Sequence, residues 1–113
     1  MSIHYEEYGI HHPAVMVFLH GGGVSGWMWE PQVKHFSTDY HCIVPDLPGH
    51  GKSQTPGEPF TIEHSAQAVI KLIEDKADGR PVTLVGFSLG AQVIVELLAL
   101  EPTRINYAII NSA

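Results

Sequence analysis

The sequence has one cysteine, few basic residues and no apolar run that could cross a membrane. Cys42 cannot form a disulfide within the chain, and its place at the start of an apolar segment predicts a small buried side chain rather than a reactive thiol. The longest apolar runs fall well short of the roughly 20 residues of a membrane helix. The first residues also lack the basic and apolar regions of a secretory signal. We therefore expect a cytoplasmic protein that does not contact membranes.

Positive charge is scarce as well. Six Lys and Arg residues stand against twelve Asp and Glu residues, which gives a formal charge of −6. Because the basic residues are not clustered, the charge disfavours nucleic acid as a partner. The eight histidines are scattered, and the adjacent pair His11 and His12 lacks the spacing of metal ligands, so no metal is expected.

The chain does contain enough apolar residues for one packed domain. Its 113 residues are 44% hydrophobic and 16% charged, which predicts a single folded domain at most. Residues 14–19 and 82–85 are apolar without alternation, as in strands buried on both faces of a parallel sheet. Residues 41–44 and 105–110 predict two more strands, and residues 3–8 predict a partly exposed one.

Helical segments alternate with these strands. Residues 29–36 predict a short helix, and a longer one begins after the N-cap Thr61 and stops at residues 78–81. Residues 91–100 predict a third helix that is almost entirely apolar, so we expect it to be covered on nearly all sides. This order predicts an α/β fold with a mostly parallel sheet and helices on both faces.

The turn between the strand at 82–85 and the helix that follows contains Gly-x-Ser-x-Gly, with Ser88 at its centre. Strand and helix can close so tightly only if Gly86 and Gly90 present no Cβ atom. Such a turn strains the serine backbone, exposes its hydroxyl at the carboxyl edge of the sheet, and leaves the Leu89 N–H unpaired at the helix N-terminus. An isolated motif of this kind is common by chance, but its strand-turn-helix context indicates a nucleophile.

Two nucleotide-binding motifs are nearly matched. The glycines of residues 21–26 have dinucleotide spacing, and Asp46 lies where a ribose-binding acid would lie. The bulky residues 27–29 disfavour this interpretation, because a dinucleotide helix must pack closely there. Residues 51–53 end like a Walker A loop, but Asp46 stands where its first glycine is required, and the segment that follows cannot open the necessary helix. No cofactor is expected.

Residues 20–23, a histidine followed by three glycines, form a loop that can assist acyl transfer by Ser88. Acyl transfer through a serine places negative charge on the carbonyl oxygen, and backbone N–H groups fixed around that oxygen lower the barrier. Loops at the carboxyl ends of neighbouring parallel strands meet in one crevice, so this loop and the serine turn can face each other. We interpret His20 as a residue that shapes the loop.

Together, residues 20–23, 46–53 and 86–90 resemble the N-terminal part of a serine α/β-hydrolase, in the branch of esterases, lactonases and carbon-carbon hydrolases. The resemblance covers essentially the whole chain. It implies that Ser88 is the nucleophile and that the N–H groups of Gly22 and Leu89 form the oxyanion hole. A serine in place of an aspartate argues against the epoxide hydrolases and haloalkane dehalogenases of the same fold.

The chain departs from this family after Ser88. The family's acid and histidine follow the serine, but no Asp or His follows here, and Asn111 stands where some members place the acid. We therefore expect residues 1–113 to be the N-terminal portion of a single α/β-hydrolase domain that lacks the lid and the C-terminal strands. Such a chain is either a fragment, or pairs with a complementary C-terminal polypeptide or in an oligomer.

The function expected from the resemblance is hydrolysis of a carboxylic ester, thioester or lactone through an acyl-enzyme, with a small acyl compound as substrate. This chain alone would be inactive, because it supplies the nucleophile and oxyanion hole but not the base. The alternative is a non-catalytic, receptor-like small-molecule binding protein on the same fold, or an inactive fragment. Fold and nucleophile do not separate these alternatives.

Overall fold

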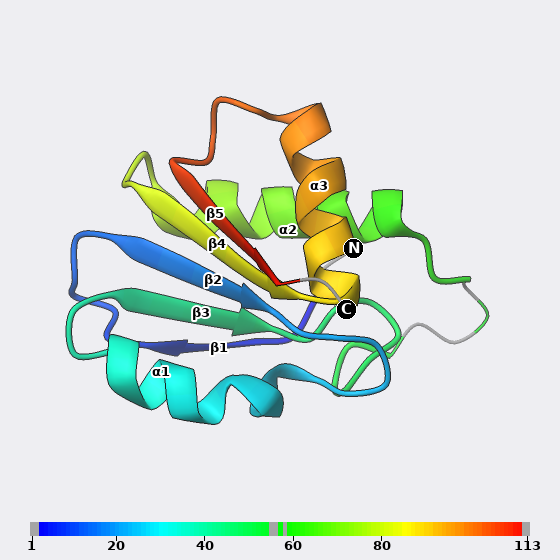
Figure 1. The fold of residues 1–113 in the computed structure, drawn as a ribbon, viewed down its shortest axis with the longest axis horizontal. Coiled ribbons are helices and arrows are strands. Elements are labelled where there is room, and N and C mark those ends of the chain that lie inside the picture. The colour runs from blue at the N-terminus through cyan, green and yellow to red at the C-terminus, as the bar shows by residue number, and fades with distance from the viewer. Residues whose placement is uncertain (1–2, 55–56, 58, 112–113) are drawn as a thin grey trace.

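A computed structural model describes residues 3–54, 57 and 59–111, and it shows a five-stranded sheet with helices on both faces (Figure 1). The order across the sheet is β1 (Tyr5–Tyr8), β3 (His41–Pro45), β2 (Val15–Leu19), β4 (Val82–Phe87) and β5 (Tyr107–Asn111). β1 runs antiparallel to β3, and the other neighbours are parallel. The predicted α/β fold with a mostly parallel sheet is confirmed.

The helices divide between the two faces of the sheet. A 3-10 turn, η1 (Gly26–Trp29), leads into α1 (Glu30–Phe36) on one face, while α2 (Ile62–Ala77) and α3 (Leu89–Leu100) cover the other (Figure 1). Each face has its own apolar core. The core under α1 consists of Met16, Phe18, Trp29, Val33, Cys42 and Val44. The larger core under α2 and α3 includes Val17, Leu19, Ile43, Leu84, Ile94 and Leu97.

The ends of α2 follow from local chemistry. The Thr61 hydroxyl oxygen accepts a hydrogen bond from the His64 N–H at 3.0 Å, as the N-cap prediction requires. At the other end, Asp78 adopts a left-handed conformation with φ of 50°, and Gly79 follows with φ of 79°. The predicted start and stop of this helix are confirmed.

The prediction for α3 was wrong in one respect. Val95 is 58% exposed and Leu100 is 40% exposed, so the helix is not covered on nearly all sides. α3 packs against β2, β4, β5 and α2, and Val95 and Leu100 lie outside these packed surfaces. All five residues of β5 are exposed too. One side of the molecule therefore presents apolar side chains that are not packed within the described part of the chain.

Cys42 behaves as predicted. It lies fully buried in β3, and burial raises the pKa of its thiol to about 11. The thiol is therefore protonated at neutral pH and unreactive. Within the part of the chain that the structure describes, no helix combines the length and apolar character needed to cross a membrane.

Candidate active site

Ser88 is the only residue between β4 and α3, because the strand runs to Phe87 and the helix begins at Leu89. The turn is therefore shorter than the sequence suggested. Ser88 has φ of 54° and ψ of −108°, a conformation that strains any residue with a Cβ atom. Two hydrogen bonds hold it there: the Ser88 N–H donates to the Asn111 carbonyl at 2.9 Å, and the Gln92 N–H donates to the Ser88 carbonyl at 3.1 Å. The predicted strain at the serine is confirmed.

The two flanking glycines permit this turn, as predicted. A Cβ atom on Gly86 would lie 2.6 Å from the Cδ1 atom of Ile94 and 2.8 Å from the backbone of Gly90. A Cβ atom on Gly90 would collide with the carbonyl group of Leu19, at the end of β2. Since one of these close contacts is with fixed backbone on a different strand, glycine is required for α3 to approach the sheet.

The loop of residues 20–23 lies against this turn. A Cβ atom on Gly21 would be 3.1 Å from the Phe87 ring, and one on Gly22 would be 3.8 Å from the Cδ2 atom of Leu89. The fold thus brings Gly22, Ser88 and Leu89 together from the ends of two adjacent parallel strands, β2 and β4. Among the hydrogen bonds of the described residues, none uses the N–H of Gly22 or of Leu89. Both groups remain available as donors.

His20 is fully buried and makes a hydrogen bond at each ring nitrogen. Its Nδ1 atom lies 2.7 Å from the Gly21 carbonyl oxygen, and its Nε2 atom accepts a hydrogen bond from the Leu47 N–H at 2.9 Å. Burial lowers the pKa of the imidazole, so the ring is neutral. These contacts confirm that His20 shapes the loop. The link to Leu47 had no signal in the sequence, because its donor is a backbone group on another loop.

Asp46 also has a structural function. Its Oδ1 atom accepts from the Gly26 N–H at 2.8 Å and its Oδ2 atom accepts from the Lys52 N–H at 2.9 Å. The carboxylate therefore fixes the loop after β3 against the start of η1. Both oxygens are committed to backbone donors, and η1 is a 3-10 turn rather than the N-terminus of a long helix. These contacts further disfavour a dinucleotide site, in which Asp46 would bind ribose.

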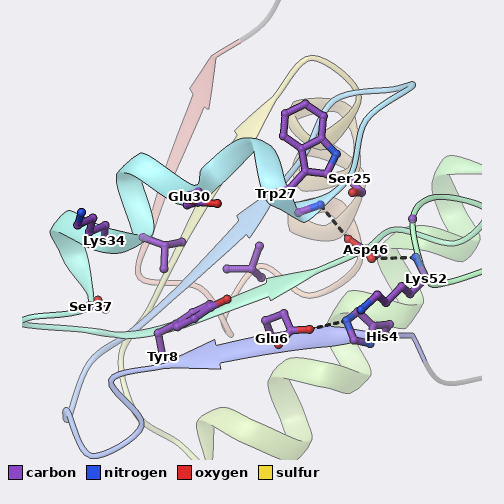
Figure 2. A pocket seen from close by; sticks show the side chains of 14 residues that line it. His4, Glu6, Tyr8, Ser25, Trp27, Glu30, Lys34, Ser37, Asp46 and Lys52 are labelled. Atoms are coloured by element: carbon purple, nitrogen blue, oxygen red, sulfur yellow. Dashed lines mark hydrogen bonds and ion pairs between the residues drawn. The ribbon is translucent and has the colours of Figure 1, made fainter.

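A cavity of about 800 Å³ lies elsewhere, between β1 and the η1–α1 segment (Figure 2). Figure 2 shows Glu6 and Tyr8 on β1 along one side of it, with Trp27 and Glu30 on the other. Neither Ser88 nor Leu89 nor Gly22 lines this cavity. It is thus separate from the serine turn.

Comparison with known proteins identifies the family. Residues 14–113 match the family described as alpha/beta hydrolase fold, and the chain belongs to this family. It is 32% identical over 105 residues to the lipase LipV of Mycobacterium tuberculosis, a match that covers 93% of this chain and 39% of that protein. It is also 32% identical over 111 residues to (E)-2-((N-methylformamido)methylene)succinate hydrolase of Acinetobacter baylyi, covering 97% of this chain and 41% of that enzyme.

Solved structures agree with this assignment. Est816, described as an N-acyl homoserine lactone degrading enzyme, superposes with a TM-score of 0.87 at 30% identity, covering 96% of this chain and 40% of that one. The serine hydrolase CCSP0084 from Cycloclasticus zankles gives a TM-score of 0.84 at 28% identity, covering 94% and 40%. The chain spans about 40% of the length of each of these relatives. It therefore corresponds to a partial α/β-hydrolase fold.

Proposed function

We propose that this chain carries the nucleophile and the oxyanion hole of a serine hydrolase that cleaves a carboxylic ester, thioester or lactone through an acyl-enzyme. The observation that carries the proposal is the strained Ser88, placed between β4 and α3 beside the unpaired N–H groups of Leu89 and Gly22. Strain at a single serine that the surrounding structure enforces is typical of a catalytic site. The names of the relatives support the same class of reaction.

In the proposed reaction the Ser88 oxygen attacks the carbonyl carbon of the substrate, and the hydroxyl proton passes to a general base. The carbonyl oxygen becomes negatively charged and accepts hydrogen bonds from the N–H groups of Gly22 and Leu89. When the tetrahedral intermediate collapses, the alcohol or thiol leaves with the proton that the base returns. Water then hydrolyses the acyl-enzyme by the same steps.

In this proposal the general base lies outside residues 1–113. His20 cannot serve, because both of its ring nitrogens are bound to backbone groups. No Asp or His follows Ser88 in the sequence. We therefore propose that residues 1–113 form the N-terminal portion of a single hydrolase domain, and that the rest of this domain, on the same chain or on a complementary polypeptide, supplies the base and its acid. This chain alone would then be inactive.

The exposed apolar side of the molecule is a suitable place for the rest of the domain to pack. Ile110 lies opposite Gly86 in the sheet, on the face that α3 occupies, and Ile109 lies opposite Val85 on the face of α1. Ile109 is 54% exposed and Ile110 is 44% exposed, so β5 presents apolar side chains on both of its faces. Surfaces of this kind mark protein contacts.

Labelling with a fluorophosphonate tests the proposal. In the active assembly, meaning residues 1–113 together with the rest of the domain on the same chain or on a second polypeptide, Ser88 is expected to be the labelled residue, because the reagent requires an activated serine. Ser88→Ala should abolish labelling and hydrolysis of a p-nitrophenyl ester, whereas the control Ser37→Ala, at the end of α1, should retain both. Absence of label on Ser88 would favour a receptor-like binding protein on the same fold or an inactive fragment.

A further inference from the structure

We propose that His20 is a positioning residue for the oxyanion hole: its imidazole orients the peptide group that carries the Gly22 N–H. This inference rests on the proposed function, since it assigns a purpose to the orientation of that donor. The observations behind it are the two hydrogen bonds of the buried ring and its place between two loops at the carboxyl edge of the sheet.

The first step is covalent geometry. The carbonyl of Gly21 and the N–H of Gly22 belong to the same planar peptide group, and in a trans peptide they point in opposite directions. The Nδ1 atom of His20 lies 2.7 Å from the Gly21 oxygen, a short hydrogen bond. By holding this oxygen on the buried side, the imidazole directs the Gly22 N–H to the other side of the peptide plane. A loop of three consecutive glycines could not fix this plane unaided.

The second step fixes the position of the proton on the ring. The Leu47 N–H donates to Nε2 at 2.9 Å, so Nε2 must present a lone pair. In a neutral imidazole the proton is then on Nδ1, which is the tautomer that can donate to the Gly21 carbonyl. Leu47 lies in the loop after β3, and Gly22 lies in the loop after the neighbouring strand β2. The first loop therefore fixes the orientation of the Gly22 N–H in the second.

The surroundings of His20 keep the ring in this state. The side chain is completely buried, and burial lowers its pKa, which favours the neutral form. The ring of His50, 5.1 Å away between centroids, lowers the pKa of His20 further, whereas the hydrogen bond to Gly21 and the charge of Asp46 raise it without offsetting the effect of burial. A positioning role differs from simple packing because it requires a donor at Nδ1, not merely a side chain that fills the space.

Two isosteric variants separate the two hydrogen bonds in the active assembly. In His20→Asn the amide nitrogen can take the place of Nδ1 and donate to Gly21, whereas in His20→Gln the amide oxygen can take the place of Nε2 and accept from Leu47. We expect His20→Gln to lower kcat by about 10- to 100-fold with KM unchanged, since a misplaced oxyanion donor weakens the transition state. His20→Asn should restore most of kcat. Equal loss in both variants, or a loss confined to KM, would overturn the proposal.

A double substitution checks that His20 acts through Gly22. In a Gly22→Pro background the N–H is absent, so adding His20→Gln should lower kcat no further. If the two substitutions instead lower kcat by independent factors that multiply, His20 does not act through the Gly22 N–H. Histidine ¹⁵N spectra of the same assembly provide a readout that does not depend on activity, and they should show His20 as the Nδ1–H tautomer. An Nε2–H tautomer would refute the second step. Failure to label Ser88 would refute the proposed function while leaving the tautomer result standing.

Discussion

A Cβ atom on Gly90, in the first turn of α3, would lie 2.6 Å from the carbonyl carbon of Leu19 at the end of β2. The helix that begins after Ser88 can therefore touch the neighbouring strand only through a residue without a side chain. This contact sets the distance between the loop after β2 and the serine turn. The arrangement of Gly22, Ser88 and Leu89 depends on it.

The first prediction follows directly. Gly90→Ala should lower the free energy of unfolding by about 1–3 kcal/mol or more, because the added methyl overlaps fixed backbone. Gly22→Ala is the matched control: its Cβ would make only an ordinary contact with Leu89 at 3.8 Å, so stability should change little. Urea unfolding of the active assembly measures both. Equal stability of the two variants would show that α3 can move away from β2.

The second prediction concerns backbone strain at Ser88. Ser88→Ala and Ser88→Gly both remove the hydroxyl and should both be inactive. Ser88→Gly should be more stable than Ser88→Ala by about 1 kcal/mol or more, because only glycine adopts φ of 54° with ψ of −108° without strain. Thermal unfolding of the two variants measures the difference. If the alanine variant is as stable as the glycine variant, the turn is not strained.

The third prediction concerns the Gly22 donor. Gly22→Pro removes the N–H and should lower kcat by about 10²- to 10³-fold. Gly22→Ala keeps the N–H and should retain activity, so the pair separates loss of the donor from addition of bulk. Circular dichroism must first show that the proline variant is folded, because proline also restricts the residue before it. Undiminished hydrolysis by a folded Gly22→Pro protein would show that the second oxyanion donor is another residue of the loop, with Gly23 the next candidate.

The fourth prediction is a pH dependence of stability. Burial lowers the pKa of His20 from its usual value of 6.5 in the folded chain. As the pH falls through 6.5, the unfolded chain binds a proton at this residue and the folded chain does not, so acid favours unfolding. Stability should therefore decrease from pH 7 toward the folded pKa, by at most about 1.4 kcal/mol per pH unit.

Urea unfolding of the active assembly between pH 7 and pH 5 measures this slope. His20→Asn should flatten it, because the titrating group is gone. The pKa of Glu7, which burial would raise, is instead lowered by hydrogen bonds to His41 and Lys76, so its contribution is lost only at pH values below its usual 4.5. It does not interfere above pH 5. An unchanged slope in His20→Asn would mean that the ring is protonated in the folded chain.

The fifth prediction concerns the exposed strand β5. The 113 residues alone should associate, because Tyr107 and Ile109 are 73% and 54% exposed on an edge strand. Ile109→Lys should reduce the association, whereas Ile10→Lys, at an exposed position outside the sheet, should not. Light scattering over a range of concentrations measures this. A monodisperse wild-type monomer would show that these residues do not form a contact surface.

Much of the fold was predictable from local patterns. Unbroken apolar segments of strand length, the Thr61 cap and the turn around Ser88 each act over a few residues, and the structure has all of them. The sequence also predicted that glycine was needed at positions 86 and 90, because strand and helix follow each other almost directly. What limited the prediction for α3 was that burial depends on neighbours, which an apolar pattern does not specify.

The sequence by itself determined the elements, the family resemblance and the three candidate site residues that we propose, because these depend on residue type and short spacing. Only the tertiary structure decided how that site is supported. The carboxylate of Asp46 binds the N–H of Gly26 from 20 residues away, and His20 binds the N–H of Leu47 from 27 residues away. These partners are backbone groups, which every residue carries. Only folding selects which of them meet, and so the orientation of the Gly22 peptide became visible only in three dimensions.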